Sequence, residues 1–364
     1  MPEGPCVLLL GGLGMIGRNL LKYIVDYQLA SYVRVADKRV PEMCHLSPTY
    51  KSLLTLPYVE VIQADLSVQE HVDRAFSAAS FSVIVNLASE TQYGHMDAIY
   101  ERSILRLRTL CAQKAALLDS CERYIEVSTC QVYECSNSSP AKENKARLKP
   151  WTAMARYHLE AEKIIATIPN LPWVIVRLPI VYGPGDIRGL MPRLVCAAVY
   201  ENTGDSMEFL WGKDLRIHTV HVQDVAAAIW HIVCAGAIHD IYNVVDDGDT
   251  TQGSLNTILE SMFKIKTGFV GSIMSNLASC KLEELVEEAN DGHMAPWSAM
   301  LKKHNIDVTP LNPYLEPELL YNNPLAVDGL KLRELGFQYS CPKLTRELLE
   351  DSLEYWVNLG LFPR

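Results

Sequence analysis

The sequence predicts an α/β fold in which a doubly wound parallel sheet is covered by helices on both faces. Apolar strand candidates alternate with helical patterns over most of the 364 residues. These strands are apolar on both faces, which is typical of parallel strands buried between two layers of helices. In addition, three glycines spaced three apart, Gly11, Gly14 and Gly17, join the first strand to the first helix. Such a strand–turn–helix unit is how doubly wound folds begin.

The glycine turn predicts a nucleotide-binding site. Gly11 permits the tight turn, Gly14 lets the backbone approach a pyrophosphate, and Gly17 lets the helix pack close to the strand. Met15 and Ile16 lie in the first turn of the helix, whose N-terminus we expect to face the phosphates.

The second strand, 32–36, ends in Asp37. A carboxylate at this place accepts hydrogen bonds from the adenosine ribose hydroxyls, which favours NAD as the cofactor. Lys38 and Arg39 follow directly and would instead suit the 2′-phosphate of NADP. The sequence therefore favours NAD over NADP and keeps both open.

The other elements follow in order. Strands are predicted at 59–62, 82–88, 124–129 and 173–178, and helices at 68–79, 96–120, 154–168 and 225–238. From about Pro184, proline, glycine and aromatic residues interleave with short segments. We therefore expect a nucleotide-binding domain over 1–183, with strands returning from about 215–245. Residues 184–364 would form mainly a substrate-binding lobe that is intertwined with it.

Composition limits the other function classes. With 49% hydrophobic and 21% charged residues the chain can bury a large core, and its net charge of −10 argues against nucleic acid as a partner. Ten cysteines without a C-x-x-C pair indicate no metal site and no disulfide framework. The apolar stretch 225–238 is too short to span a bilayer. The N-terminus has no secretory pattern, so we expect a cytoplasmic protein that does not bind membranes.

Five further motifs follow along the chain. They are Asp65-Leu66, Asn86-Leu87-Ala88, Val127-Ser-Thr129-Cys-Gln-Val-Tyr133, Arg177-Leu-Pro-Ile-Val-Tyr-Gly-Pro-Gly-Asp186 and His221-Val-Gln-Asp224-Val-Ala. Together with the glycine turn they resemble the extended short-chain dehydrogenase/reductase superfamily, the NAD-dependent epimerase/dehydratase family, whose members include nucleotide-sugar enzymes. The resemblance covers nearly the whole chain.

The resemblance implies a Rossmann-type sheet and an oxidoreductase or epimerase that acts on a hydroxylated small molecule such as a nucleotide sugar. It also implies that Asp65 and Leu66 contact the adenine, that Leu87 and Ala88 line the cofactor, and that Thr129 contacts the substrate. Family members often form homodimers through two long helices, which correspond here to regions near 96–120 and 151–168.

The catalytic pair departs from the family, whose Y-x-x-x-K supplies a proton relay and a ribose ligand. Matching Leu159-Glu-Ala-Glu162 to the usual tail puts Met154 at the tyrosine position and His158 at the lysine position. In this register the Tyr157 hydroxyl could swing back over Met154. His158 would then bind the nicotinamide ribose and titrate near neutral pH. A second register makes Tyr157 the tyrosine and puts Ala161 at the lysine position.

Two further departures concern the substrate. Cys130 and Gln131 stand where a dehydratase has an Asp-Glu pair, which argues against dehydration, and Ile217 stands where many sugar-nucleotide enzymes have an arginine. Two hypotheses follow. Either the chain is an enzyme in which Thr129 orients the substrate and Tyr157 or His158 handles the proton, or it is a catalytically degenerate dinucleotide-binding scaffold or redox sensor.

Overall fold

The computed structural model describes residues 3–134 and 136–364, so Cys135 lies outside the described residues. Its centre is a sheet of seven parallel strands in the order β10-β6-β5-β4-β1-β2-β3. The strands are β1 (Cys6–Leu10), β2 (Tyr32–Asp37), β3 (Val59–Gln63), β4 (Val83–Asn86), β5 (Arg123–Thr129), β6 (Trp173–Leu178) and β10 (Asp240–Asn243). This topology confirms the predicted fold class.

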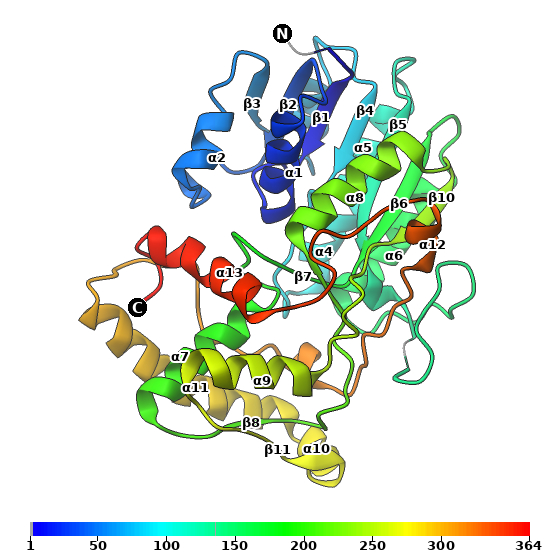
Figure 1. Cartoon of the computed structure of the whole chain (residues 1–364). Helices are drawn as coiled ribbons and strands as arrows, with labels where there is room; N and C mark the ends of the chain where they lie inside the picture. Colours follow the sequence, from blue (N-terminus) through cyan, green and yellow to red (C-terminus); the bar gives the residue numbers. More distant parts are fainter. Residues whose placement is uncertain (1–2, 135) are drawn as a thin grey trace.

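Helices cover both faces of the sheet, as Figure 1 shows. The helices α1 (Met15–Asp26) and α8 (Val222–Ala235) pack into the apolar cluster on one face, and α3 (Gln69–Ala75), α5 (Leu107–Ala115) and α6 (Ala153–Ile165) contribute to the cluster on the other. Alternate residues of β1 point to the two layers. Val7 and Leu9 belong to one apolar cluster and Leu8 and Leu10 to the other, and all four are fully buried. Burial on both sides is why the strands are apolar throughout.

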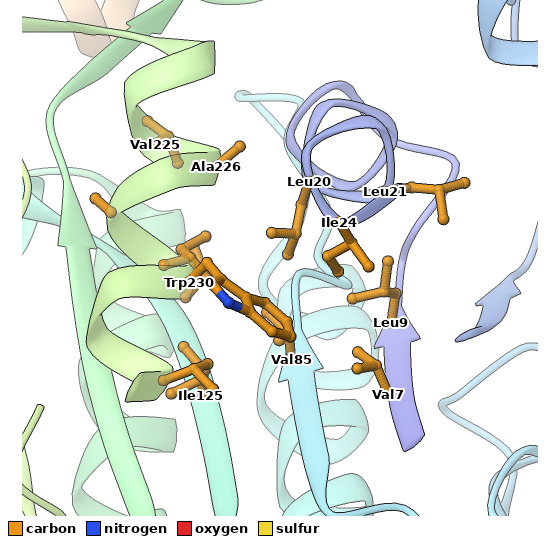
Figure 2. Packing of buried hydrophobic residues seen from close by; sticks show 14 of the residues in the cluster. Val7, Leu9, Leu20, Leu21, Ile24, Val85, Ile125, Val225, Ala226 and Trp230 are labelled. Atoms are coloured by element: carbon orange, nitrogen blue, oxygen red, sulfur yellow. The ribbon is translucent and has the colours of Figure 1, made fainter. Parts of the chain in front are cut away.

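Figure 2 shows the core beneath α1 and α8. Leu20 and Ile24 of α1 and Trp230 of α8 pack over strand residues that include Val85 and Ile125. Their contact fixes α1, and with it the glycine turn at its start, against the sheet.

A second group of helices forms a smaller lobe, in the lower part of Figure 1. Its helices are α7 (Met191–Thr203), α9 (Gln252–Phe263), α10 (Gly271–Ser279), α11 (Leu282–Lys303) and α13 (Arg346–Asn358). Residues of α7, α9, α11 and α13 share one apolar cluster. Two short parallel pairs accompany them, β8 (Met207–Phe209) with β11 (Thr267–Phe269) and β7 (Ile180–Tyr182) with β9 (Thr219–His221). The split into two domains at residue 183 stays a prediction.

Some elements differ from the expected ones. The helix predicted over 96–120 consists of α4 (Asp97–Tyr100), a π-helical segment η2 (Glu101–Arg106) and α5, and the helix predicted over 68–79 ends at Ala75. Only β10 of the segment 215–245 joins the large sheet, because β9 pairs with β7. The remaining elements are α2 (Pro48–Leu53), α12 (Leu330–Glu334) and the 3-10 turns η1 (Pro41–Met43), η3 (Cys130–Val132) and η4 (Pro317–Leu320). In the described ranges, none of the helices is long and apolar enough to cross a membrane.

Candidate functional site

In the glycine turn after β1, side chains do not fit at Gly11 and Gly17. Gly11 has a φ of +75°, and a Cβ there would lie 2.7 Å from the Cα of Ala88. At Gly17 a Cβ would lie 2.5 Å from the Cα of Gly12. The turn therefore packs against the end of β4, and α1 packs against the turn.

Gly14 caps α1 without a side-chain hydrogen bond, and the first turn of α1 contains no acidic residue. Among the described residues, the backbone N–H groups of Met15, Ile16 and Gly17 have no acceptor. A Cβ on Gly14 would meet only the carbonyl oxygen of Gly11, at 3.2 Å, so the space above the turn is open. Free N–H groups at a helix N-terminus suit a pyrophosphate.

Asp37 ends β2 with its side chain almost fully buried. Its Oδ2 accepts the backbone N–H of Leu13 at 3.1 Å, and its Oδ1 accepts that of Arg39 at 3.0 Å. The carboxylate thereby ties the glycine turn to β2, and each oxygen retains a lone pair for a ribose hydroxyl.

The two basic residues after Asp37 both lie near carboxylates. The Nε of Arg39 is 3.6 Å from Oδ1 of Asp37, and the Nζ of Lys38 is 3.7 Å from Glu90. A 2′-phosphate placed at Arg39 would have to lie beside the Asp37 carboxylate, so this arrangement favours a dinucleotide without that phosphate.

The residues assigned to the adenine follow β3. Asp65 Oδ1 accepts the hydroxyl of Ser67 at 2.7 Å, and Oδ2 accepts Arg102 Nη2 at 2.9 Å. Leu66 is buried. Leu87 and Ala88 follow β4, and the structure brings Ala88 against Gly11, as described above. Their contacts with a cofactor stay predictions.

Thr129 is the last residue of β5 and the N-cap of η3. Its Oγ1 accepts the backbone N–H of Gln131 at 3.2 Å, and the residue is half-buried. The neighbouring Ser128 is buried, and its hydroxyl has no partner among the described residues. Thr129 therefore presents a hydroxyl at the end of a central strand, where ligands of open α/β sheets bind.

Met154 and Tyr157 lie on α6. Met154 is 8% exposed and packs with Tyr100 and Ile104 in a small apolar cluster. The Tyr157 ring packs against the same cluster, with its centroid 6.1 Å from that of Tyr100 and the Arg156 guanidinium 5.2 Å away. Within the described chain the Tyr157 hydroxyl has no hydrogen-bond partner. Its role as a proton relay stays a prediction.

His158 is buried one turn after Met154. Its Nε2 lies 3.2 Å from the hydroxyl of Ser89, in the segment that follows β4, and its Nδ1 is buried without a partner among the described residues. Burial, together with the charge of Arg108, holds the pKa of His158 well below its usual range. The expectation that His158 titrates near neutral pH is therefore wrong, and the side chain is neutral.

A chain of side-chain hydrogen bonds that the sequence did not reveal crosses the site. The hydroxyl of Thr152 donates to Oε1 of Gln131, and Nε2 of Gln131 donates to the hydroxyl of Tyr93, both at 2.9 Å. Tyr93 comes from the loop after β4, and its ring packs on the cluster that contains Met154. Burial raises the pKa of Tyr93 to about 12. An aromatic residue in the otherwise polar loop 89–95 was the only available sequence signal.

A buried ion pair holds α6 on the sheet. Arg177 of β6 donates from Nε to Glu162 of α6 at 3.1 Å, and from Nη1 to the hydroxyl of Tyr133 at 2.8 Å. All three side chains are buried. The pair fixes the helix that carries Met154 and His158 relative to the strand end.

The small lobe reaches over the same strand ends. Arg188 donates to Oε1 of Gln92 at 3.1 Å, and Oε2 of Glu318 accepts the backbone N–H of Ala153 at 3.0 Å. These contacts join the loop after β4 and the start of α6 to the lobe. The site therefore lies where the two parts of the chain meet, as substrate clefts commonly do.

Comparisons with known proteins agree with this geometry. A low-salt glycan biosynthesis protein of Haloferax volcanii is 25% identical over 250 residues, which cover 65% of this chain and 76% of that protein.

Solved structures share the fold. The UDP-glucuronic acid 4-epimerase of Bacillus cereus, solved with UDP-glucuronic acid and NAD, aligns with a TM-score of 0.70 at 15% identity, covering 97% of this chain and 99% of that chain. The enzyme WbmG of Bordetella bronchiseptica, solved with NAD and UDP, aligns with a TM-score of 0.70 at 14% identity, covering 99% and 97%. Residues 7–244 match the family described as the NAD dependent epimerase/dehydratase family. This match spans more than half of the chain and confirms the resemblance: the protein belongs to the NAD dependent epimerase/dehydratase family.

Proposed function

We propose that the protein is an NAD-dependent oxidoreductase or epimerase that acts on a carbinol or carbonyl carbon of a hydroxylated small molecule. The observation that carries the proposal is the open turn at Gly14, where three free backbone N–H groups of α1 lie next to the buried carboxylate of Asp37. NAD, when bound, accepts or supplies a hydride. Asp65 and Leu66 would hold its adenine, and Leu87 and Ala88 would line its path across the strand ends.

The chain's own residues would position the substrate and the proton. We assign Thr129 to the substrate oxygen, because its hydroxyl ends β5 beside the cofactor path. We assign the neutral His158 to the nicotinamide ribose: on cofactor binding its Nε2 would exchange its hydrogen bond with the Ser89 hydroxyl for one with a ribose hydroxyl. Tyr157 remains a candidate for proton transfer, since its hydroxyl is not engaged within the described chain.

A nucleotide sugar is the first substrate class to test, because WbmG and the Bacillus cereus epimerase were solved with UDP or a UDP sugar. Ile217 is buried and cannot pair with a diphosphate. We therefore propose the wider class of hydroxylated small molecules and treat nucleotide sugars as probes.

A specific observation favours a second candidate, a dinucleotide-binding scaffold or redox sensor. Met154 lies in an apolar cluster with Tyr100 and Ile104, and in the register that puts it at the family's tyrosine position it could not relay a proton. A scaffold would bind NAD and transfer no hydride.

The experiment combines binding and turnover. Calorimetry with NAD, NADH, NADP and NADPH measures the affinity of the purified protein, and absorbance at 340 nm follows NADH after addition of UDP-glucose, UDP-glucuronic acid or dTDP-glucose to the NAD complex. We expect binding of NAD and NADH and, with at least one sugar, either a net change in absorbance or, for an epimerase that regenerates NAD, a new sugar product detected by NMR. Binding without turnover of any probe would favour the scaffold, and no binding would contradict both candidates.

The location, the nucleic-acid partner and the oligomeric state of the protein stay predictions. We expect a cytoplasmic protein, and the lack of a disulfide bond among the nine described cysteines agrees with a reducing compartment. We also expect no nucleic-acid partner, and a homodimer formed through the region of α4 to α5 and through α6. Light scattering of the purified protein measures its oligomeric state.

A further inference from the structure

We propose that Tyr93 is the proton donor of this site and delivers its hydroxyl proton to the substrate oxygen that Thr129 also binds. This inference rests on the proposed function. It names a catalytic residue that lies outside α6, on the loop after β4, in a family member whose α6 offers a methionine at the usual tyrosine position.

Tyr93 lies on the loop after β4, beside Met154 of α6. Its ring packs against the cluster of Tyr100, Ile104 and Met154, so it covers the methionine that stands at the relay position. Its hydroxyl is tied to Gln131, whose backbone N–H in turn contacts Oγ1 of Thr129 at 3.2 Å. Gln131 thus bridges Tyr93 and Thr129 at the end of β5.

The hydrogen bonds around the Gln131 side chain are donated in one direction, from Thr152 to Gln131 and from Gln131 to Tyr93. The Thr152 oxygen accepts the N–H of Ala155 at 3.1 Å, so its proton is free to be donated to Oε1 of Gln131. The amide of Gln131 is therefore fixed with its Nε2 toward Tyr93, where it can only donate. The Tyr93 oxygen accepts this bond, and its own O–H proton has no acceptor within the described chain. That proton remains available to a ligand.

Tyr157 and His158 are the other two candidates for proton transfer. The Tyr157 ring is held between the Arg156 guanidinium and Tyr100, and its hydroxyl has no hydrogen bond that links it to Thr129. His158 is neutral, and its Nδ1 is buried without a partner among the described residues. Of these three side chains, only Tyr93 is oriented by a residue that also contacts Thr129.

The proposed step reduces a substrate carbonyl group to an alcohol. The O–H bond of Tyr93 breaks and a new O–H bond forms on the substrate carbonyl oxygen, while the carbonyl carbon receives the hydride electron pair. The tyrosinate is stabilised by the Gln131 amide and then takes a proton from water. Burial raises the pKa of Tyr93 to about 12, so the side chain is protonated at neutral pH and holds the proton that the reduction consumes.

The test uses two readouts on the full chain. Tyr93→Phe removes one hydroxyl and leaves the ring that packs on Met154. With NADH and two carbonyl probes, dTDP-4-keto-6-deoxyglucose and isatin, we expect kcat/KM to fall by about 10²–10⁴-fold and the solvent deuterium isotope effect on kcat to disappear. NADH affinity measured by fluorescence should stay within twofold.

A matched control deletes a hydroxyl elsewhere. Tyr27 is 65% exposed at the C-terminal end of α1, and Tyr27→Phe should leave turnover unchanged. The second readout does not need turnover. In protein labelled with ¹³C at tyrosine Cζ, the signal missing from Tyr93→Phe identifies Tyr93. We expect this signal to report a neutral phenol at pH 10.5 and to shift in Gln131→Leu.

The outcomes separate the two proposals. If Tyr93→Phe reduces both probes as fast as the wild type, or if Tyr157→Phe alone loses turnover, Tyr93 is not the donor. A Tyr93 signal that titrates near pH 10, unaffected by Gln131→Leu, would overturn the hydrogen-bond arrangement itself. A wild-type protein that binds NADH and reduces neither probe counts against the proposed function, and the Tyr93 signal then decides whether its hydroxyl is held in the site.

Discussion

The side-chain amide of Gln131 donates to the hydroxyl of Tyr93, with Nε2 and Oη 2.9 Å apart. Gln131 occupies the turn directly after Thr129, at a place where a dehydratase of this family would carry an acidic residue. A carboxylate there would accept the Tyr93 proton, whereas the amide leaves it free. The amide at this position therefore leaves the Tyr93 proton unengaged within the described chain.

The glycine turn predicts the effect of a side chain at Gly14. Gly14→Val would place methyl groups in the open space above the turn, so we expect NAD binding to be lost while the fold remains. Saturation of the wild type at about 100 times Kd should stabilise it by about 2.7 kcal/mol, and the variant should gain nothing. Thermal unfolding with and without NAD measures this. Gly292→Val is the control, since a Cβ at Gly292 meets no atom within 4 Å.

The position of Asp37 predicts that the protein binds NAD more tightly than NADP. Asp37→Ala removes the carboxylate from the ribose site and from beside Arg39, so the ratio of NAD affinity to NADP affinity should fall by about tenfold or more, the equivalent of about 1.4 kcal/mol. Calorimetric titrations with both cofactors measure the ratio. Asp26→Ala, at the exposed end of α1, should leave it unchanged. An unchanged ratio in Asp37→Ala would show that Asp37 serves only the turn.

The pair of Arg177 and Glu162 predicts a strong coupling between α6 and β6. Arg177→Leu leaves the buried Glu162 carboxylate without its partner, and the free energy of unfolding should fall by about 3–5 kcal/mol. The double variant Arg177→Leu with Glu162→Leu should recover much of this loss, because no buried charge remains unpaired. Urea unfolding of the four proteins measures the coupling. If the double variant loses the sum of the two single effects, the residues do not act as a pair.

The burial of His221 predicts that the free energy of unfolding falls in acid. Burial lowers the pKa of His221 to about 4, while in the unfolded chain it lies near 6.5. Between these values the unfolded chain binds the proton and the folded protein does not, so this stabilising difference is complete above pH 6.5 and is lost as the pH falls toward 4.

His221→Asn tests this assignment, because asparagine can keep the N-cap of α8 and cannot titrate. We expect the loss of unfolding free energy between pH 7 and pH 4.5 to be smaller in the variant by about 2–3 kcal/mol. Urea unfolding at the two pH values gives this difference. Parallel pH profiles of the two proteins would mean that another group controls the acid limb.

Much of the fold could be predicted because its signals are local. The strand 6–10, the glycine triplet and Asp37 lie within one short unit, and the bounds of β6 agree with the predicted ones. The π-helical segment Glu101–Arg106 could not be predicted, because the shift from i+4 to i+5 hydrogen bonds barely alters the apolar pattern of a helix. The C-terminal ends of α3 and α5 lie before the predicted ends at 79 and 120 for a similar reason. The residues that follow each helix continue its apolar pattern.

The catalytic part of the site was less predictable, because it depends on contacts distant in sequence. The neutral state of His158 follows from burial beside Arg108, about fifty residues earlier, and a reference pKa gives the opposite expectation. Tyr93 lies in a loop without periodicity, and its bond to Gln131 joins positions separated by the helical segments α4, η2 and α5 and by β5. The register that puts Met154 at the tyrosine position stays a prediction, and no local pattern in the sequence pointed to the contact of Tyr93 with Gln131.

We propose that the protein transfers a hydride, and deuterium carried on NADH follows this hydride to the product. Wild-type protein is mixed with NADH carrying deuterium at C4 and with dTDP-4-keto-6-deoxyglucose or isatin, and the product is analysed by mass spectrometry. We predict that deuterium appears on the former carbonyl carbon in step with the loss of absorbance at 340 nm. NADH that binds to the protein and keeps all its deuterium, with no labelled alcohol from either probe, would contradict the account and leave a dinucleotide-binding scaffold.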